Sequence, residues 1–278
     1  MTGKLTTAEP REFSGDLDWG RLARLDGLRP VVDPNDCDGI KNKLIDGIQW
    51  RALKRTLPKT GRILDLGCGI GRFATRITRL GLEYVGIDSA HPMLIAAKRA
   101  HSTGGAGFAQ ALAARLPFAD GGFDVCLACG VFQYLSHTPL AEPTLREIRR
   151  VLAPRGRLLL LEQASMSGRK SGSVSNTSSE NDYIQQVGAF FETEDVTTVR
   201  LPGLTLRSAS ALSPARKAPG ALAGLSPVAV WLEAVSTRVA AVRRLRREPY
   251  YDFLLSARRR DGDKDAAGAN HTELESIQ

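Results

Sequence analysis

The sequence predicts a doubly wound α/β fold, in which helices cover both faces of a mainly parallel sheet of seven strands. Short apolar runs alternate with segments of helical periodicity from residue 62 onwards, as in a parallel sheet with helical crossovers. One run has leucine at every position from 158 to 161, which is typical of a strand buried on both faces.

The segment before the first strand, residues 1–58, is expected to contain an arm and a helix. Its first part is rich in glycine, proline and charged residues, which favours an extended or loosely packed conformation. Apolar residues then recur at helical spacing from Ile40 to Leu57. Asp38 is a candidate N-cap of this helix, and Pro58 ends it.

Strands and helices alternate through the expected core, residues 59–201 and 249–260. The expected strands are residues 62–66, 84–87, 107–111, 123–128, 157–161, 196–201 and 251–256. The expected helices are residues 71–80, 91–100, 140–152 and 182–190, with a turn at residues 154–156. An insert at residues 202–248 interrupts the core and contains a helix with a basic face, and residues 261–278 are expected to form a disordered tail.

Composition indicates a globular protein with a sizeable core, because apolar residues make up 42% and charged residues 24% of the chain. The longest apolar run has the length of a strand and is far shorter than the ~20 residues of a membrane-spanning helix. The first residues, MTGKLTTAEPREFSG, lack the apolar segment of a secretory signal. We therefore expect a cytoplasmic protein.

The net charge is +8, and much of the excess lies in the insert helix and directly after the last strand. Such an excess can attract nucleic acid, anionic lipid or an acidic substrate. A solvated basic helix face is the simpler interpretation, and peripheral membrane contact through residues 238–247 is an alternative.

The four cysteines are expected to be free thiols, because the chain is long and shows no secretory signal. Cys126 and Cys129 form a CxxC pair inside an apolar run, where strand alternation sends them to opposite faces. We interpret the pair as strand residues of the core rather than a metal or redox site, and we expect no metal.

The stretch ILDLGCGIGRF, residues 63–73, places three glycines in five positions between a strand and a helix. A helix N-terminus offers unpaired N–H groups, and glycines allow a ligand to approach the backbone. A dinucleotide fingerprint would require glycine at positions 67, 69 and 72, but position 72 is Arg72 and the third glycine comes early, at Gly71. The pattern is therefore D-x-G-x-G-x-G, with Asp65 as its acid.

Four ordered stretches between residues 61 and 162 resemble the class I S-adenosylmethionine-dependent methyltransferases, which have a Rossmann-like fold. They are ILDLGCGIGRFATRITRLG, YVGIDSAHPMLIAAKR, LPFADGGFDVCLACGVFQYL and LREIRRVLAPRGRLLLLEQ. The stretches are most similar to those of small-molecule members of the family. The resemblance implies S-adenosylmethionine as the cofactor.

The resemblance also implies roles for individual residues. The three glycines would line the methionine and ribose parts of the cofactor, Asp65 would act towards the amino group, and Asp88 would accept both ribose hydroxyls. Met93 would pack on the adenine. The full set of expected cofactor-binding residues is Asp65, Gly67, Gly69, Gly71, Asp88, Ser89, Met93, Leu112, Ala113 and Cys129.

The sequence departs from the family pattern at the adenine site. Family members often have an acidic residue just before the third stretch, but no acid lies between Gly107 and Pro117. Gln110, or backbone groups around Leu112 and Ala113, would replace it.

Candidate catalytic residues follow the fourth strand and end the fifth. Related natural-product O-methyltransferases often have a histidine after the fourth strand, where this chain has Tyr134, with His137 one helical turn later. Either residue is a candidate base or substrate contact; the alternatives are a surface histidine and a packing tyrosine. Glu162 ends the fifth strand, at the edge of the sheet where ligands bind.

Two further segments are expected to close the site. The segment DGIKNKLID resembles an N-terminal helix that covers the cofactor in related enzymes, so residues 1–58 are expected to act as a lid, with Lys41 and Asn42 near the cofactor carboxylate. The insert at residues 202–248 is expected to cap the acceptor site.

The expected function is methyl transfer to a small-molecule acceptor, at a hydroxyl of a sugar, polyketide or other natural-product or glycan intermediate. One alternative is an RNA methyltransferase, suggested by the basic charge and disfavoured by the absence of an N/D-P-P-Y-like tetrapeptide. The other is a non-catalytic cofactor-binding partner protein. An NAD-linked oxidoreductase is disfavoured by Arg72.

Overall fold

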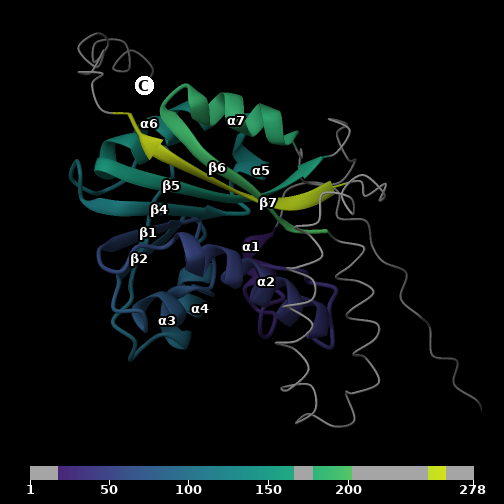
Figure 1. The fold of residues 1–278 in the computed structure, drawn as a ribbon. Coiled ribbons are helices and arrows are strands. Elements are labelled where there is room, and N and C mark those ends of the chain that lie inside the picture. Colours follow the sequence, from purple (N-terminus) through teal and green to yellow (C-terminus); the bar gives the residue numbers. More distant parts are fainter. Residues whose placement is uncertain (1–17, 166–177, 202–249, 261–278) are drawn as a thin grey trace, which may run out of the picture.

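A seven-stranded sheet forms the centre of the computed structural model, which describes residues 18–165, 178–201 and 250–260 (Figure 1). The strand order is β3-β2-β1-β4-β5-β7-β6, and in this described sheet β7 runs in the direction opposite to the other six strands. The strands are β1 (Arg62–Leu66), β2 (Glu83–Asp88), β3 (Gly107–Gln110), β4 (Phe123–Cys129), β5 (Leu152–Ser165), β6 (Phe191–Arg200) and β7 (Tyr250–Arg259). The expected seven-stranded, mainly parallel sheet is confirmed.

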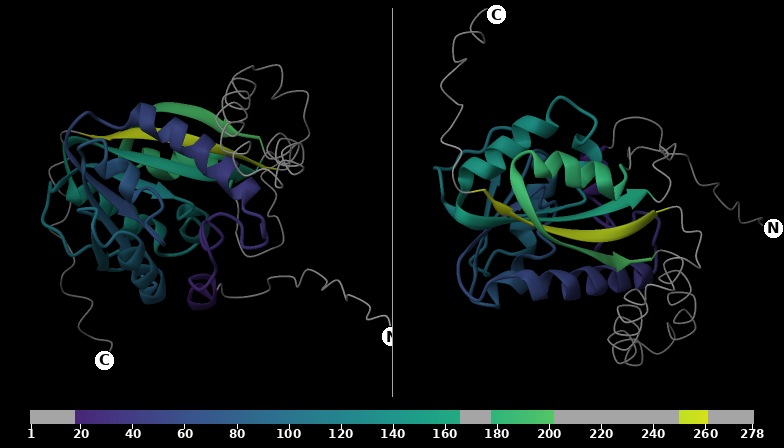
Figure 2. Two further views of the ribbon diagram at one scale, coloured as in Figure 1. Left: turned by 90° about the horizontal axis from the view of Figure 1, so that it is seen from below. Right: turned by 45° about the horizontal axis from the view of Figure 1, so that its top comes forward.

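Helices cover both faces of the sheet (Figures 1 and 2). On one face lie α5 (Phe132–Leu135), α6 (Ala141–Val151) and α7 (Glu180–Gly188), whose buried side chains join one core cluster. On the other face, α2 (Ile40–Thr56) and α3 (Ala74–Thr78) contribute to a second cluster. The remaining described helices are α4 (His91–Ala100), against β2 and β3, and the short α1 (Trp19–Leu22), against α4.

The run of four leucines in β5 shows how the sequence builds both cores. Leu158 and Leu160 belong to the cluster under α6 and α7, whereas Leu159 and Leu161 belong to the cluster under α2 and α3. Alternation along a strand requires this division, and a two-sided core therefore requires an unbroken apolar run. The CxxC pair divides in the same way, because Cys126 lies in the first cluster and Cys129 packs against the second.

Several element boundaries differ from the predictions; β6, for example, begins at Phe191 rather than at residue 196. β5 already begins at Leu152, and its pairing with β4 jumps from Leu152 to Arg157. The predicted turn is therefore a bulge within the strand, where Arg155 has a φ of 63°. The predicted helix at residues 71–80 is shorter, since α3 spans Ala74–Thr78 after the glycine loop.

The arm is folded where the structure describes it. Asp18 caps α1 by accepting a hydrogen bond from the Arg21 N–H at 3.0 Å. The expected extended conformation is therefore not found from Asp18 onwards. The N-cap of α2 is Gly39 with a φ of 71°, and Asp38 instead accepts from the Ile40 N–H at 3.1 Å. Helix α5 was not predicted, because one helical turn leaves too short a periodic pattern.

Residues 1–17, the whole insert at residues 202–248 with its predicted basic helix, and the predicted tail lie outside the described residues. Within the described part of the chain, no helix is long and apolar enough to cross a membrane. Among the same residues, no group of three or more His, Cys, Asp or Glu side chains is placed to hold a metal ion. All four cysteines are free thiols.

Candidate active site

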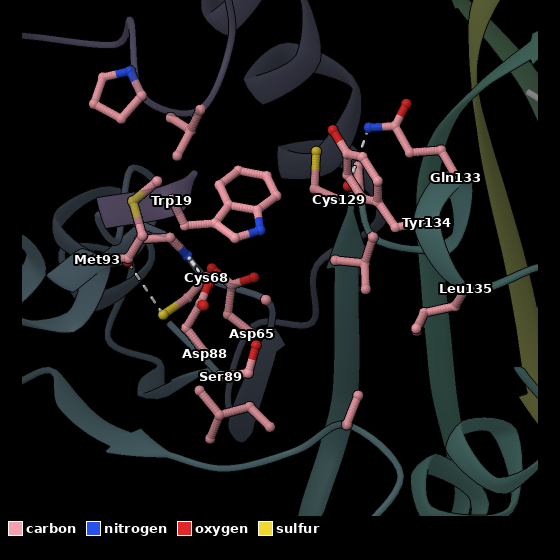
Figure 3. A pocket seen from close by; sticks show the side chains of 18 of the residues that line it. Trp19, Asp65, Cys68, Asp88, Ser89, Met93, Cys129, Gln133, Tyr134 and Leu135 are labelled. Atoms are coloured by element: carbon pink, nitrogen blue, oxygen red, sulfur yellow. Dashed lines mark hydrogen bonds between the residues drawn. The ribbon is translucent and has the colours of Figure 1, made fainter. Parts of the chain in front are cut away.

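A cavity of about 770 Å³ lies at the carboxyl ends of β1, β2 and β4 (Figure 3). Ligands bind at this edge of a doubly wound sheet, at the point between β1 and β4 where the strand order reverses. The loops after these strands form the floor, and the residues from Trp19 to Pro34 in the arm contribute a wall. The sequence segments that meet here are far apart in the chain.

The loop after β1 requires glycine, because its backbone angles are left-handed and side chains of other loops pack against it. Gly67 and Gly69 have φ values of 65° and 54°, and both line the cavity. A Cβ atom on Gly67 would lie 2.6 Å from Val131, and one on Gly69 would lie 2.5 Å from Val31. Gly71 does not line the cavity; a Cβ there would meet the Phe108 ring at 2.9 Å, so this glycine allows packing against β3.

Asp88 at the end of β2 presents a carboxylate of fixed orientation to the cavity. Its Oδ2 accepts a hydrogen bond from the Gly69 N–H at 2.9 Å, and its Oδ1 accepts one from the Ala90 N–H at 2.8 Å. Burial raises the pKa of Asp88, and the backbone N–H donors oppose that effect. The neighbouring Ser89 and the buried Met93 also line the cavity, as Figure 3 shows.

Asp65 lies deeper, on the cavity floor beside Asp88 (Figure 3). The Tyr84 hydroxyl donates a hydrogen bond to its Oδ2 at 2.7 Å. Burial raises the pKa of Asp65 to about 7, while Tyr84 and the positive charge of Arg72 act in the opposite direction. The protonation state of Asp65 therefore changes when a charged group enters the cavity.

The expected adenine side is lined by the loop after β3, from Ala111 to Ala114. Leu112 and Ala113 are both among the lining residues, and the Leu112 side chain is 63% exposed. Gln110, the side-chain substitute considered from the sequence, does not line the cavity; its Nε2 donates to the Ser89 carbonyl at 2.9 Å.

Tyr134 lines the cavity on the side away from the glycine loop. Its ring meets the Trp19 indole edge to face, with 5.7 Å between the ring centres (Figure 3). Burial raises the pKa of Tyr134 to about 12, with a smaller contribution from the negative charge of Glu162. The phenol therefore stays protonated at neutral pH.

Glu162 does not line the cavity and lies beneath the loop after β4, with 2% of its surface exposed. Its Oε1 accepts the backbone N–H groups of Val131 and Phe132 at 2.7 and 2.8 Å, and its Oε2 accepts that of Gln133 at 3.3 Å. Burial raises the pKa of Glu162 to about 8, against the effect of these donors. The structure thus gives Glu162 a positioning role at the start of α5.

His137 also lies away from the cavity lining. It is exposed, and its Nε2 lies 2.9 Å from the Ser178 Oγ. The expected one-turn relation to Tyr134 does not hold, because α5 ends at Leu135. Among the described residues that line the cavity there is no histidine.

Sequence reasoning missed several residues of the cavity wall, Trp19 and Arg72 among them, and expected Lys41 and Asn42 near the cofactor. Trp19 and Arg72 line the cavity; the first lies in an arm without a clear pattern, and the second was considered only as a replaced glycine. Lys41 forms an ion pair with Asp33, and Asn42 Nδ2 donates to the Asp33 carbonyl at 2.9 Å. Neither Lys41 nor Asn42 lines the cavity.

The sheet order, with acids near the carboxyl ends of β1 and β2, is that of an α/β domain of the Rossmann-like class. Residues 64–160 match the family described as "Methyltransferase domain". This part of the chain is therefore a class I S-adenosylmethionine-dependent methyltransferase domain.

Two methyltransferases of other organisms are similar in sequence to part of this chain. The chain is 40% identical over 102 residues to an uncharacterized methyltransferase of Mycolicibacterium gilvum, covering 36% of this chain and 40% of that protein. It is 42% identical over 123 residues to a demethylmenaquinone methyltransferase of Thermus thermophilus, covering 41% and 54% respectively. The matches thus span about half or less of these relatives' lengths.

The fold is shared with geranyl diphosphate methyltransferase in complex with S-adenosylmethionine, at a TM-score of 0.56 and 18% identity. That alignment covers 82% of this chain and 93% of the other.

Proposed function

We propose that this chain is an S-adenosylmethionine-dependent methyltransferase that methylates a hydroxyl group of a small molecule. The observation that carries the proposal is the carboxylate of Asp88, held at the cavity by the N–H groups of Gly69 and Ala90. A carboxylate has about four acceptor sites on its two oxygens, so lone pairs remain for the ribose hydroxyls beside the backbone bonds. The domain match at residues 64–160 supports this assignment.

In the proposed complex, the cofactor crosses the cavity floor from Asp65 towards Leu112. Gly67 and Gly69 leave room for the methionine and ribose parts, and Met93 packs on the adenine. Backbone groups of the loop after β3 take the place of the missing acid at the adenine edge. Residues 18–58 act as a lid through the wall that the arm contributes.

When bound, the cofactor supplies a methyl group on a positively charged sulfur. The chain's own contribution is to align the acceptor oxygen with that methyl group and to exclude water. Tyr134 suits a donor role rather than a base, since its raised pKa of about 12 keeps the phenol protonated. An acceptor hydroxyl that is itself acidic, such as a phenol or enol, fits a site of this kind.

The lining of the acceptor side favours a polyketide-type acceptor over a sugar. Tyr134 and Leu140 present large apolar surface there, and both line the cavity together with Trp19. Burial of this apolar surface favours binding of an apolar ligand, whereas the hydroxyls of a sugar would lose hydrogen bonds to water against it. The insert at residues 202–248 is proposed to complete the acceptor site.

Calorimetric titration with S-adenosylmethionine and S-adenosylhomocysteine tests the cofactor assignment. Asp88→Asn should weaken binding of both by about ten- to a hundredfold, because hydrogen bonds to a charged group contribute roughly 1.5–3 kcal/mol. Asp120→Asn is the matched control, since this acid is 80% exposed and does not line the cavity. Unchanged affinity in Asp88→Asn would contradict the assignment.

Incubation with methyl-labelled cofactor and separate pools of small molecules and RNA tests the activity. Label in an apolar, phenol- or enol-bearing small molecule is the expected result. Label in RNA alone would favour the alternative acceptor class, and binding without transfer to either pool would indicate a non-catalytic partner protein.

A further inference from the structure

Arg72 is a buried cation at the wall of the cavity. It follows the glycine loop, its side chain is 7% exposed, and it lines the cavity together with Cys129 and Asp65. The guanidinium rests on the Phe73 ring, with 4.3 Å between Cζ and the ring centre. A cation in such a position has been removed from water and needs strong acceptors.

The described residues give Arg72 only weak acceptors. Its Nη2 donates to the Cys129 Sγ at 2.8 Å, and burial raises the pKa of that thiol to about 12, so the sulfur is uncharged. Its Nη1 is buried and has no hydrogen-bond partner among the described residues. The nearest carboxylate to Nη1, that of Asp46, lies at 3.6 Å, beyond a good hydrogen bond.

Asp46 is moreover shared with a second cation. Arg76 Nη2 donates to the same Asp46 Oδ1 at 2.6 Å. Two guanidinium groups therefore share one carboxylate, so Asp46 does not give Arg72 a carboxylate of its own. An anionic group of a ligand would supply the strong acceptor that Arg72 Nη1 lacks among the described residues.

Charged groups of both signs line the same cavity. Arg72, Asp65 and Asp88 are all among its lining residues, and Asp65 lies beside Asp88 (Figure 3). An α-amino acid joined to a ribose has a matching series: a carboxylate, an ammonium group and two hydroxyls. Arg72, Asp65 and Asp88 are complementary to these groups in that order.

We propose that Arg72 binds the carboxylate of the amino-acid part of S-adenosylmethionine and is a cofactor-specificity residue of this site. The inference rests on the proposed function. It assigns to Arg72 the role that the sequence suggested for Lys41 and Asn42, which are instead bound to Asp33. A planar guanidinium suits a carboxylate because it can donate two parallel hydrogen bonds.

A double-mutant cycle between one side chain and one ligand group tests this inference. The ligands are S-adenosylmethionine and its decarboxylated analogue, which keeps the adenosine, the sulfonium and the amino group. The wild-type chain should bind S-adenosylmethionine about ten- to a hundredfold more tightly than the analogue, and Arg72→Gln should bind the two within about threefold. Arg79→Gln, which removes an exposed charge at the end of α3, should retain the wild-type difference.

The cycle separates a binding role from a structural one. If Arg72 only stabilised the loop, Arg72→Gln would weaken both ligands equally, and the inference would be overturned. Arg72→Lys keeps the charge and provides a second variant if Arg72→Gln unfolds; it should retain an intermediate preference for the carboxylate. A wild-type chain that binds both ligands equally would refute the inference and leave the proposed function intact, whereas a chain that binds neither would contradict both.

Discussion

Two acids, the half-buried Asp88 and the buried Glu162, accept backbone hydrogen bonds from the loops on either side of the cavity. Asp88 at the end of β2 accepts the Gly69 N–H of the loop after β1, and Glu162 in β5 accepts N–H groups from the loop after β4. Only Asp88 also lines the cavity, whereas Glu162 is covered by the residues that it holds. An acid near the carboxyl end of a parallel strand can therefore bind a ligand or position a loop, and the direction of its side chain decides between them.

Glu162→Leu should have the largest effect on this comparison, because it removes the acceptor of three backbone N–H groups at once. We expect the free energy of unfolding to fall by about 3 kcal/mol, since each buried unsatisfied group costs roughly 1–3 kcal/mol. The loop after β4 should lose its fixed position on the acceptor side of the cavity, whereas Asp88 keeps its hydrogen bonds to Gly69 and Ala90. Denaturant titration measures the stability, and calorimetry should find the S-adenosylmethionine affinity within about threefold of wild type. A large loss of cofactor affinity with intact acceptor turnover would reverse the assignment of the two acids.

The second largest effect is expected in the pH dependence of cofactor affinity, which reports on the ionisation of Asp65. With a pKa of about 7 in the ligand-free chain, the carboxyl is mostly protonated at pH 6 and mostly ionised at pH 8. An incoming ammonium group selects the ionised form, so affinity should rise about tenfold from pH 6 to pH 8. Calorimetry in buffers of different ionisation enthalpy should detect proton release on binding. Asp65→Asn should abolish both the pH dependence and the release; their persistence would show that another group titrates.

The raised pKa of Asp65 also makes the stability of the folded chain depend on pH. Because folding raises the pKa of Asp65 from 3.8 to about 7, the folded chain binds a proton more tightly than the unfolded chain. Its contribution to stability is complete below pH 3.8 and is lost as the pH rises through about 7. Thermal unfolding of the ligand-free chain between pH 4 and 8 should show this decline, and Asp65→Asn should reduce it.

Trp19→Ala should have the smallest effect and tests the contribution of the arm to the acceptor side. The edge-to-face contact with Tyr134 is lost, and such pairs contribute about 0.5–1.5 kcal/mol. We expect the acceptor KM to rise about two- to tenfold at an unchanged pH profile. Trp19→Phe, which keeps an aromatic ring, is the matched control and should stay close to wild type.

The strands, the position of the glycine loop and the acids that follow β1 and β2 could be predicted because each depends on a local pattern. Alternation in β5 requires a continuous apolar run, and a left-handed loop after β1 requires glycine. Helix α5 and the short α1 escaped prediction, because single turns are held by contacts from distant parts of the chain rather than by their own periodicity.

The sequence by itself determined the sheet, its two-sided core and the loop with its acids, since hydrophobic periodicity and glycine geometry act between near neighbours in the chain. The tertiary structure decided which polar side chains meet at the cavity. It directs Glu162 under a loop and His137 towards Ser178, and it brings Arg72 to the wall with too few acceptors. These side-chain orientations depend on how α5, the arm and the sheet pack together, and no local sequence pattern determines that packing.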